Sequence, residues 1–147
     1  MMLHESMNQQ YEVEDIGAGN FHSVFLVREK KFPRRRHLLT CGHKGSLGVP
    51  RYQDTHRLQD LKISQVPDFD KIDFLIVKFN SSAIIDVDNN MYFWGENFDG
   101  SKQPELICNF EHRLLDLSFG YKHALALLEG GRVFSWGDGT YGELGLG

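Results

Sequence analysis

The stretch from Leu117 to Gly147 reads LSFGYKHALALLEGGRVFSWGDGTYGELGLG, and it decides the fold. Within it, the apolar run Ala124–Leu128 is followed by a turn at Glu129–Gly131 and a second apolar run, Arg132–Trp136. Two short apolar runs around a glycine-containing turn predict a β-hairpin. A Gly-x-x-His motif precedes this hairpin, and Trp-Gly and Gly-x-Leu-Gly motifs follow it.

The same order of motifs occurs twice more, so the chain contains three related units. In the first unit, Phe21 and His22 close a Gly-x-x-His motif, and a Cys-Gly pair stands where the third unit has Trp-Gly. The second unit keeps Trp-Gly, but Lys78 replaces the first glycine and Ser81 replaces the histidine. The repeat positions that we expect to hold the structure are Gly19, His22, Gly42, Trp94, Gly95, Gly120, His123, Trp136, Gly137, Gly142 and Gly145.

Hairpins repeated in series predict an all-β chain. No window of helical length carries a sustained apolar stripe, which argues against helices. We expect an N-terminal tail at residues 1–14, followed by a repeat region at 15–147. Within that region, the expected units are about 15–66, 67–108 and 109–147.

The order Gly-x-x-His, apolar strand, Trp-Gly and Gly-x-Leu-Gly resembles the repeat of the regulator of chromosome condensation (RCC1) family, over about residues 15–147. The resemblance implies a β-propeller of four-stranded blades, which in this family number seven. Three units cannot close such a ring, so we expect a partial propeller. Its open ends would be covered by the remaining blades, by a partner or by an oligomer, and the chain would be a fragment or a truncated form.

Composition limits the classes of partner and compartment. The 147 residues carry a formal net charge of −4, which argues against nucleic acid as the main partner. The longest apolar run, Phe74–Val77, is too short to cross a membrane, and the polar N-terminus lacks the apolar core of a signal peptide. We read Cys41 and Cys108 as free thiols, and we expect a cytoplasmic or nuclear protein.

No motif predicts a catalytic residue, a bound cofactor or a metal site, so we expect no enzyme activity. His22 and His123 occupy equivalent repeat positions, so we expect each imidazole to satisfy backbone groups between neighbouring blades. Trp94 and Trp136 are expected to be packing anchors. The segment Asp86–Asn90 resembles the start of a calcium loop but lacks the later ligands, so it predicts a hairpin turn.

A basic cluster in the first unit gives the candidate binding site, with Lys30, Lys31, Arg34, Arg35 and Arg36 as its residues. It falls at the tip of an extended hairpin, where it is a nuclear-import signal, a contact for an acidic partner or a solvated loop. The long segment Val49–Asp70 is expected to be a loop that adds to this surface.

Three functions follow from these observations. The first is a non-enzymatic protein-interaction scaffold, because propellers bind partners through their loops. The second comes from the resemblance alone: the founding RCC1 member exchanges guanine nucleotide on a small GTPase, which implies a GTPase partner. The third, chromatin binding, is disfavoured by the negative net charge.

Overall fold

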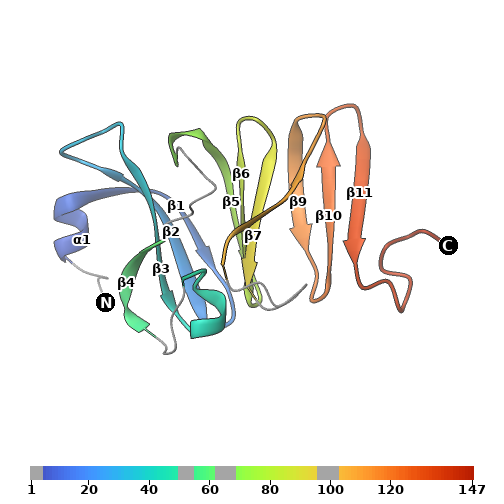
Figure 1. The fold of residues 1–147 in the computed structure, drawn as a ribbon, viewed down its shortest axis with the longest axis horizontal. Coiled ribbons are helices and arrows are strands. Elements are labelled where there is room, and N and C mark those ends of the chain that lie inside the picture. Colours follow the sequence, from blue (N-terminus) through green and yellow to red (C-terminus); the bar gives the residue numbers. More distant parts are fainter. Residues whose placement is uncertain (1–4, 50–54, 62–68, 96–102) are drawn as a thin grey trace.

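The computed structural model describes residues 5–49, 55–61, 69–95 and 103–147, and they form three antiparallel β-sheets. The sheets stand side by side in chain order, with the short helix α1 beside the first and β11 at the far side of the third (Figure 1). No described helix is long and apolar enough to span a membrane. The prediction of an all-β chain that forms part of a propeller is confirmed.

The first sheet has four strands in chain order, and α1 (Glu5–Gln10) leads directly into it. Its strands are β1 (Tyr11–Ala18), β2 (His22–Glu29), β3 (Arg36–Gly42) and β4 (Thr55–Leu61). Residues 5–14, which we assigned to an N-terminal tail, form α1 and the start of β1. Part of the segment expected to be a loop at Val49–Asp70 is strand β4, while residues 50–54 and 62–68 lie outside the described residues.

The second sheet also has four strands in chain order, and the third has three. The strands of the second sheet are β5 (Ile72–Lys78), β6 (Ser81–Asp86), β7 (Asn90–Gly95) and β8 (Glu105–Asn109). Those of the third are β9 (Leu114–Phe119), β10 (His123–Leu128) and β11 (Arg132–Gly137). There are also two short 3-10 helices. The first, η1 (Lys44–Ser46), follows β3, and the second, η2 (Phe69–Lys71), precedes β5. The boundaries of the three sequence units stay predictions.

The turn at Asp86–Asn90 joins β6 to β7, as expected for a hairpin. The Asp86 carboxylate accepts hydrogen bonds from the backbone N–H groups of Asp88 and Asn90 and from the Asn90 side-chain amide, each at 2.9 Å. Asn89 supplies the left-handed conformation at the centre of the turn, with φ of 63°. The carboxylate therefore binds the turn's own N–H groups, which is the role that a turn requires of it.

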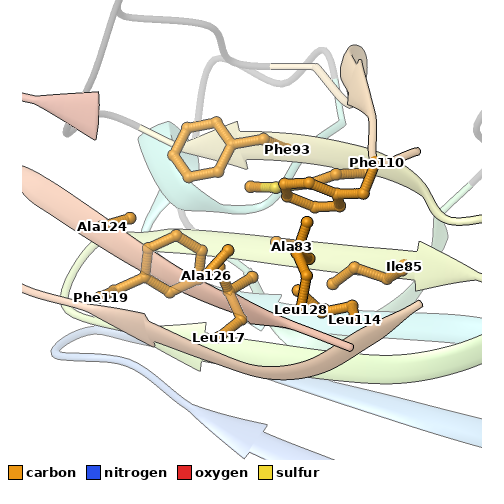
Figure 2. Close-up of a cluster of buried hydrophobic side chains, with 11 residues drawn as sticks. Ala83, Ile85, Phe93, Phe110, Leu114, Leu117, Phe119, Ala124, Ala126 and Leu128 are labelled. Atoms are coloured by element: carbon orange, nitrogen blue, oxygen red, sulfur yellow. The ribbon is translucent and has the colours of Figure 1, made fainter. Parts of the chain in front are cut away.

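Apolar side chains fill the two spaces between successive sheets, because alternate residues of a strand point to opposite faces. Between the first and second sheets, Val24, Leu26 and Leu38 meet Ile84, Tyr92 and Trp94. Figure 2 shows the second of these layers, where side chains from β6 and β7 face those from β9 and β10. The members drawn there include Ala83, Ile85, Phe93, Phe110, Leu114, Leu117, Phe119, Ala124, Ala126 and Leu128.

Trp94, the penultimate residue of β7, belongs to the layer between the first and second sheets and is fully buried. The turn that follows η1 covers the indole of Trp94. A Cβ added to Gly48 in this turn would lie 2.7 Å from the Trp94 Cδ1 atom. The Gly-x-Leu-Gly motif of one unit therefore packs on the tryptophan of the next unit. The corresponding Trp136 is only half-buried and packs against Phe110, with the ring centroids 6.5 Å apart.

Replacing Trp94 with alanine should lower the free energy of unfolding by about 3–5 kcal/mol, because the indole leaves a cavity between two sheets. Trp136→Ala is the matched control, and it should cost about 1–2 kcal/mol because its ring is already partly in water. Urea denaturation followed by circular dichroism measures both. Equal losses in the two variants would show that the first layer does not depend on Trp94.

His22 connects the first sheet to the second through a hydrogen bond between its Nε2 atom and the Ser82 hydroxyl, at 2.8 Å. The residue is buried, and the Gly19 N–H donates to its backbone carbonyl at 2.9 Å. Burial, together with a smaller effect of the nearby His43, lowers the pKa of His22 to about 4. We expected the imidazole to satisfy backbone groups between blades, but its described partner is a side-chain hydroxyl.

The lowered pKa makes a prediction about stability in acid. The unfolded chain binds a proton at His22 near pH 6.5, whereas the folded chain resists protonation down to about pH 4. Stability should therefore fall as the pH drops through this range, by on the order of 3 kcal/mol from this group. In His22→Gln, which does not titrate, the loss between pH 7 and pH 4 should be smaller by that amount. Parallel stability curves for the two proteins would contradict the prediction.

Candidate protein-interaction site

The repeat positions lie where the sheets meet their connecting loops. Gly42, Gly95 and Gly137 each end the third strand of a sheet, with φ of 121°, 125° and 106°. Only glycine adopts this conformation without strain, so the chain turns in the same way after each third strand. Gly19 and Gly120 each lie against the ring of the histidine three residues later, while Gly142 and Gly145 have open space around them.

The hairpin that joins β2 to β3 carries the basic cluster, and backbone hydrogen bonds hold its tip in one conformation. Arg35 N–H donates to the Phe32 carbonyl at 2.8 Å across a turn with Pro33 at its second position, where proline is favoured. Below the turn, Glu29 N–H donates to the Arg35 carbonyl at 2.9 Å. Lys30 ties the hairpin to α1, because its N–H donates to the Gln10 carbonyl at 3.0 Å.

Glu14 of β1 organises the base of the hairpin by binding two of its arginines. Arg28 donates to one carboxylate oxygen, and Arg36 donates to the other at 2.5 Å. Partial burial alone would raise the pKa of Glu14, but the hydrogen bonds from the two guanidinium groups hold it below its usual value. The carboxylate therefore stays ionised and fixes both arginines against the sheet.

Arg36 also reaches the start of the second sheet. Its Nη1 atom donates to the carbonyl of Ile72 at 3.0 Å and to those of Asp70 and Phe69 at 3.2 and 3.3 Å. With only 14% of its side chain exposed, Arg36 joins two sheets and is not displayed to a partner. Lys30 is similarly engaged, since its Nζ atom donates to the Asn8 carbonyl at 2.5 Å.

The remaining three predicted cations form an exposed group around an aromatic ring. The Arg35 guanidinium lies 4.9 Å from the centre of the Phe32 ring, and the Lys31 ammonium lies 5.7 Å from it. Arg34 is exposed on the same turn, and Phe32 itself is 46% exposed. We call Lys31, Phe32, Arg34 and Arg35 the basic tip. Such cation–π contacts keep long side chains near the ring while leaving their charged groups in water.

The sequence prediction missed three residues that complete these contacts. Phe32 lies inside the basic run, and an aromatic residue among cations was the signal for it. Ser82, the partner of His22, is one of two adjacent serines in the second unit. Glu14, which binds Arg28 and Arg36, fell in the segment assigned to the tail, so no pattern pointed to it.

The described residues lack a metal-binding cluster, and their two thiols have raised pKa values. They contain no group of three or more histidine, cysteine, aspartate or glutamate side chains that could hold a metal ion. Burial raises the pKa of the Cys41 thiol, and it does the same for Cys108, so both are poor nucleophiles at neutral pH. The chemistry that this site offers is reversible binding through charge, hydrogen bonds and one apolar ring.

The arrangement of three stacked antiparallel sheets, each with a glycine at the end of its third strand, defines a segment of a β-propeller. Residues 115–143 match the family model described as "Regulator of chromosome condensation (RCC1) repeat". The chain therefore contains an RCC1-type repeat in its third sheet, as the sequence motifs predicted.

Two curated relatives and one solved structure agree with this identification. The chain is 49% identical over 152 residues to human "Probable E3 ubiquitin-protein ligase HERC6", with 92% of this chain and 14% of that protein covered. It is 34% identical over 76 residues to human "E3 ubiquitin-protein ligase HERC2", covering 45% of this chain and 2% of the relative. Prp20p from Saccharomyces cerevisiae matches with a TM-score of 0.68 at 21% identity, over 90% of this chain and 34% of that one.

These coverages limit what the matches show. The chain spans only a small part of the curated relatives and about a third of the solved propeller. The identity to the solved structure is low enough that the match shows the fold alone. The ligase names belong to those whole proteins.

The division of the five predicted cations into structural and displayed residues can be tested by measuring the free energy of unfolding of variants. Arg36→Ala should lower the free energy of unfolding by about 2 kcal/mol, because it removes a partner of Glu14 and leaves three carbonyls without their donor. Arg34→Ala is the matched control and should change it by less than about 0.5 kcal/mol. Urea denaturation measures both variants. Equal effects would contradict the division into structural and displayed cations.

Proposed function

We propose that the chain is a non-enzymatic protein-interaction scaffold that binds an acidic segment of a partner at the basic tip. The observation that carries this proposal is the exposed group of Lys31, Arg34 and Arg35 around Phe32, on a hairpin anchored to α1 and Glu14. An anchored hairpin loses little conformational entropy when it binds, which favours affinity. We place the protein in the cytoplasm or nucleus, consistent with the thiols at Cys41 and Cys108 being unpaired.

The chemistry of the basic tip favours carboxylates. A guanidinium group binds a carboxylate through two parallel hydrogen bonds, and Phe32 adds an apolar contact beside it. The chain as a whole is negative, with a net charge of −4, so the tip contrasts with the rest of the molecule. That contrast favours an acidic protein segment over nucleic acid, which would meet repulsion beyond the tip.

Ligase chemistry is not part of this proposal, although two relatives carry ligase names. A ligase that carries its modifier on a cysteine needs an accessible, reactive thiol. In this chain, both thiols are partly buried with raised pKa values. We therefore assign to these repeats the binding of a partner and not the transfer of a group.

Nucleotide exchange on a small GTPase is the second candidate. It is favoured by the match to Prp20p, whose structure was described together with its binding to Gsp1p and histones. Nucleotide-release kinetics on a panel of small GTPases separate the two functions. Accelerated release by this chain would support exchange, whereas unchanged release across the panel would favour the scaffold.

The basic tip can be tested with a synthetic peptide of alternating glutamate and leucine as probe. Arg34→Ala/Arg35→Ala should weaken its binding by about tenfold or more, because two charge-assisted contacts are lost. The matched control, Lys78→Ala/Lys122→Ala, removes the same charge from exposed positions on other sheets. Isothermal titration at two salt concentrations measures the binding of each protein.

The control variant distinguishes binding of the peptide at the basic tip from a general attraction to positive charge. Unchanged binding by the control, together with loss in the tip variant, supports the proposal. Equal weakening in the two variants would mean that the peptide responds only to net charge. No binding by the wild-type chain to this peptide would also contradict a carboxylate-binding tip.

A further inference from the structure

The turns that join the first two strands of each sheet lie at one end of the molecule, opposite the basic tip. They are the turns between β1 and β2, between β5 and β6 and between β9 and β10, and they lie along the lower edge of the sheets in Figure 1. Each of these turns carries one aromatic residue, namely Phe21, Phe79 and Tyr121. His43, in the loop after β3, lies beside the first of them. We call Phe21, His43, Phe79 and Tyr121 the aromatic row.

The rings of the aromatic row form two edge-to-face pairs. The centroids of Phe21 and His43 are 6.5 Å apart, with an angle of 62° between the ring planes. Phe79 of the second sheet and Tyr121 of the third are paired at 5.9 Å and 86°. Phe21 and Tyr121 are nevertheless 68% and 63% exposed. Large rings that gather on neighbouring turns while they remain this exposed mark a site of interaction.

Backbone hydrogen bonds fix these turns in place. The Asn20 N–H donates to the Phe79 carbonyl at 2.6 Å, which joins the turn of the first sheet to that of the second. The His43 N–H donates to the Phe21 carbonyl at 2.7 Å. Since these N–H groups are used within the molecule, we infer that the row recognises a partner through its side chains and not by pairing with an added strand.

Phe79 adopts a left-handed backbone conformation, with φ of 53°. Asn89 is the other non-glycine residue with a positive φ in the described part of the chain, and asparagine tolerates this conformation better than a bulky residue does. At the place of Phe79, the first unit has Asn20. Backbone strain of this kind collects at functional sites, and here it accompanies the contact of the Phe79 ring with Tyr121.

The charged side chains around the aromatic row have both signs. Lys44, Lys78 and Lys122 are exposed, and each is next in sequence to a residue of the row. Asp138 is also exposed, and its N–H donates to the Lys122 carbonyl at 2.8 Å. Hydrogen bonds from Thr140, with a smaller effect of Lys122, lower the pKa of Asp138, so its carboxylate is ionised at neutral pH. An anion among the cations disfavours a nucleic acid backbone, and recognition falls to the rings.

A segment in the polyproline II conformation matches the spacing of these rings. It has three residues per turn and rises about 3.1 Å per residue, so every third residue returns to the same face after about 9 Å. Stacked sheets lie about 10 Å apart, so successive turns present their rings at a similar interval. The backbone of such a segment makes no internal hydrogen bonds, and the Tyr121 hydroxyl can donate to one of its carbonyls.

We propose that the aromatic row binds a proline-rich segment of a partner protein in the polyproline II conformation. Proline residues at every third position contact the pair of Phe21 and His43 and the pair of Phe79 and Tyr121, as proline-rich segments do in other grooves lined by aromatic rings. This inference does not rest on the basic tip, which lies at the opposite end of the sheets and recognises charge.

A fluorescent peptide of repeated Pro-Pro-Leu is the probe. About nine residues span roughly 28 Å in the polyproline II conformation, which is enough to cross three stacked sheets. Phe21→Ala and Tyr121→Ala should each weaken its binding to the 147-residue chain by about tenfold, because each ring is a central contact. Phe32→Ala removes an exposed ring from the basic tip, so this matched control should leave binding unchanged. Fluorescence anisotropy measures the binding, and circular dichroism checks the fold of each variant.

Phe79→Asn separates the contribution of the ring from that of the turn. Asparagine occupies the matching place in the first unit, at Asn20, and it tolerates the left-handed backbone, so the variant keeps the turn and loses the ring. Its binding should also weaken by about tenfold. Added salt should change the affinity for this neutral peptide by less than about twofold, since no ion pair is formed.

Several results would overturn the proposal. The first is a wild-type chain that does not bind the peptide, and the second is equal binding by Phe21→Ala, Tyr121→Ala and the wild type. Equal weakening in Phe32→Ala would show that the peptide binds elsewhere. Equal binding of a Gly-Gly-Leu peptide would show that the row does not select the polyproline II conformation.

Two further measurements distinguish other occupants of the aromatic row. A single-stranded oligonucleotide that binds more tightly than the peptide, and less tightly to Tyr121→Ala, would overturn the proposal in favour of base stacking. A dimer in sedimentation that Tyr121→Ala converts to a monomer would overturn it in favour of a second copy. Arg34→Ala/Arg35→Ala should leave binding of the Pro-Pro-Leu peptide unchanged, so the basic tip and the aromatic row fail independently.

Discussion

Each sheet in this molecule has two apolar faces, and burying both of them is the constraint on which the rest of the structure depends. The layer between the first two sheets satisfies it with the fully buried Trp94 and with the hydrogen bond between His22 and Ser82, the residue that pairs with Trp94 across β6 and β7. The layer between the second and third sheets uses a different mixture, in which the small Ala124 and Ala126 accompany Phe93 and Phe119, whose ring centroids lie 6.0 Å apart. The repeat thus fixes where side chains point, while their sizes vary as long as each layer is filled.

The repeat motifs made most of the fold predictable from the sequence. The hairpin predicted at Ala124–Trp136 is β10 and β11, and the turn predicted at Asp86–Asn90 joins β6 to β7. The prediction failed at the edges of the first sheet. Strand β1 is mostly exposed and reads Tyr-Glu-Val-Glu-Asp, so it lacks the alternation of apolar residues that reveals a half-buried strand.

The candidate site was predictable in position but not in detail. A run of cations identified the hairpin tip, yet nothing in that run distinguishes Arg36 from Arg34. The distinction arises from Glu14 and from the carbonyl groups near Ile72, which lie 22 and 36 residues away in the chain. The partner of His22 was missed for the same reason, because Ser82 is 60 residues away and belongs to another sheet. Contacts of this range come from the stacking of sheets, which a local pattern does not encode.

The glycine that ends each third strand has a consequence for how such repeats diverge. The second unit has exchanged its first glycine for Lys78 and its histidine for Ser81, yet it keeps Gly95. At Gly95, any added side chain would clash with the backbone of Asn80 and Ser81. Replacing this glycine with any other residue would therefore disturb the fold of the unit. The other positions of the repeat motif can therefore be substituted while this glycine is kept. In a unit that has lost most of the motif, this glycine is the position by which the repeat can still be recognised.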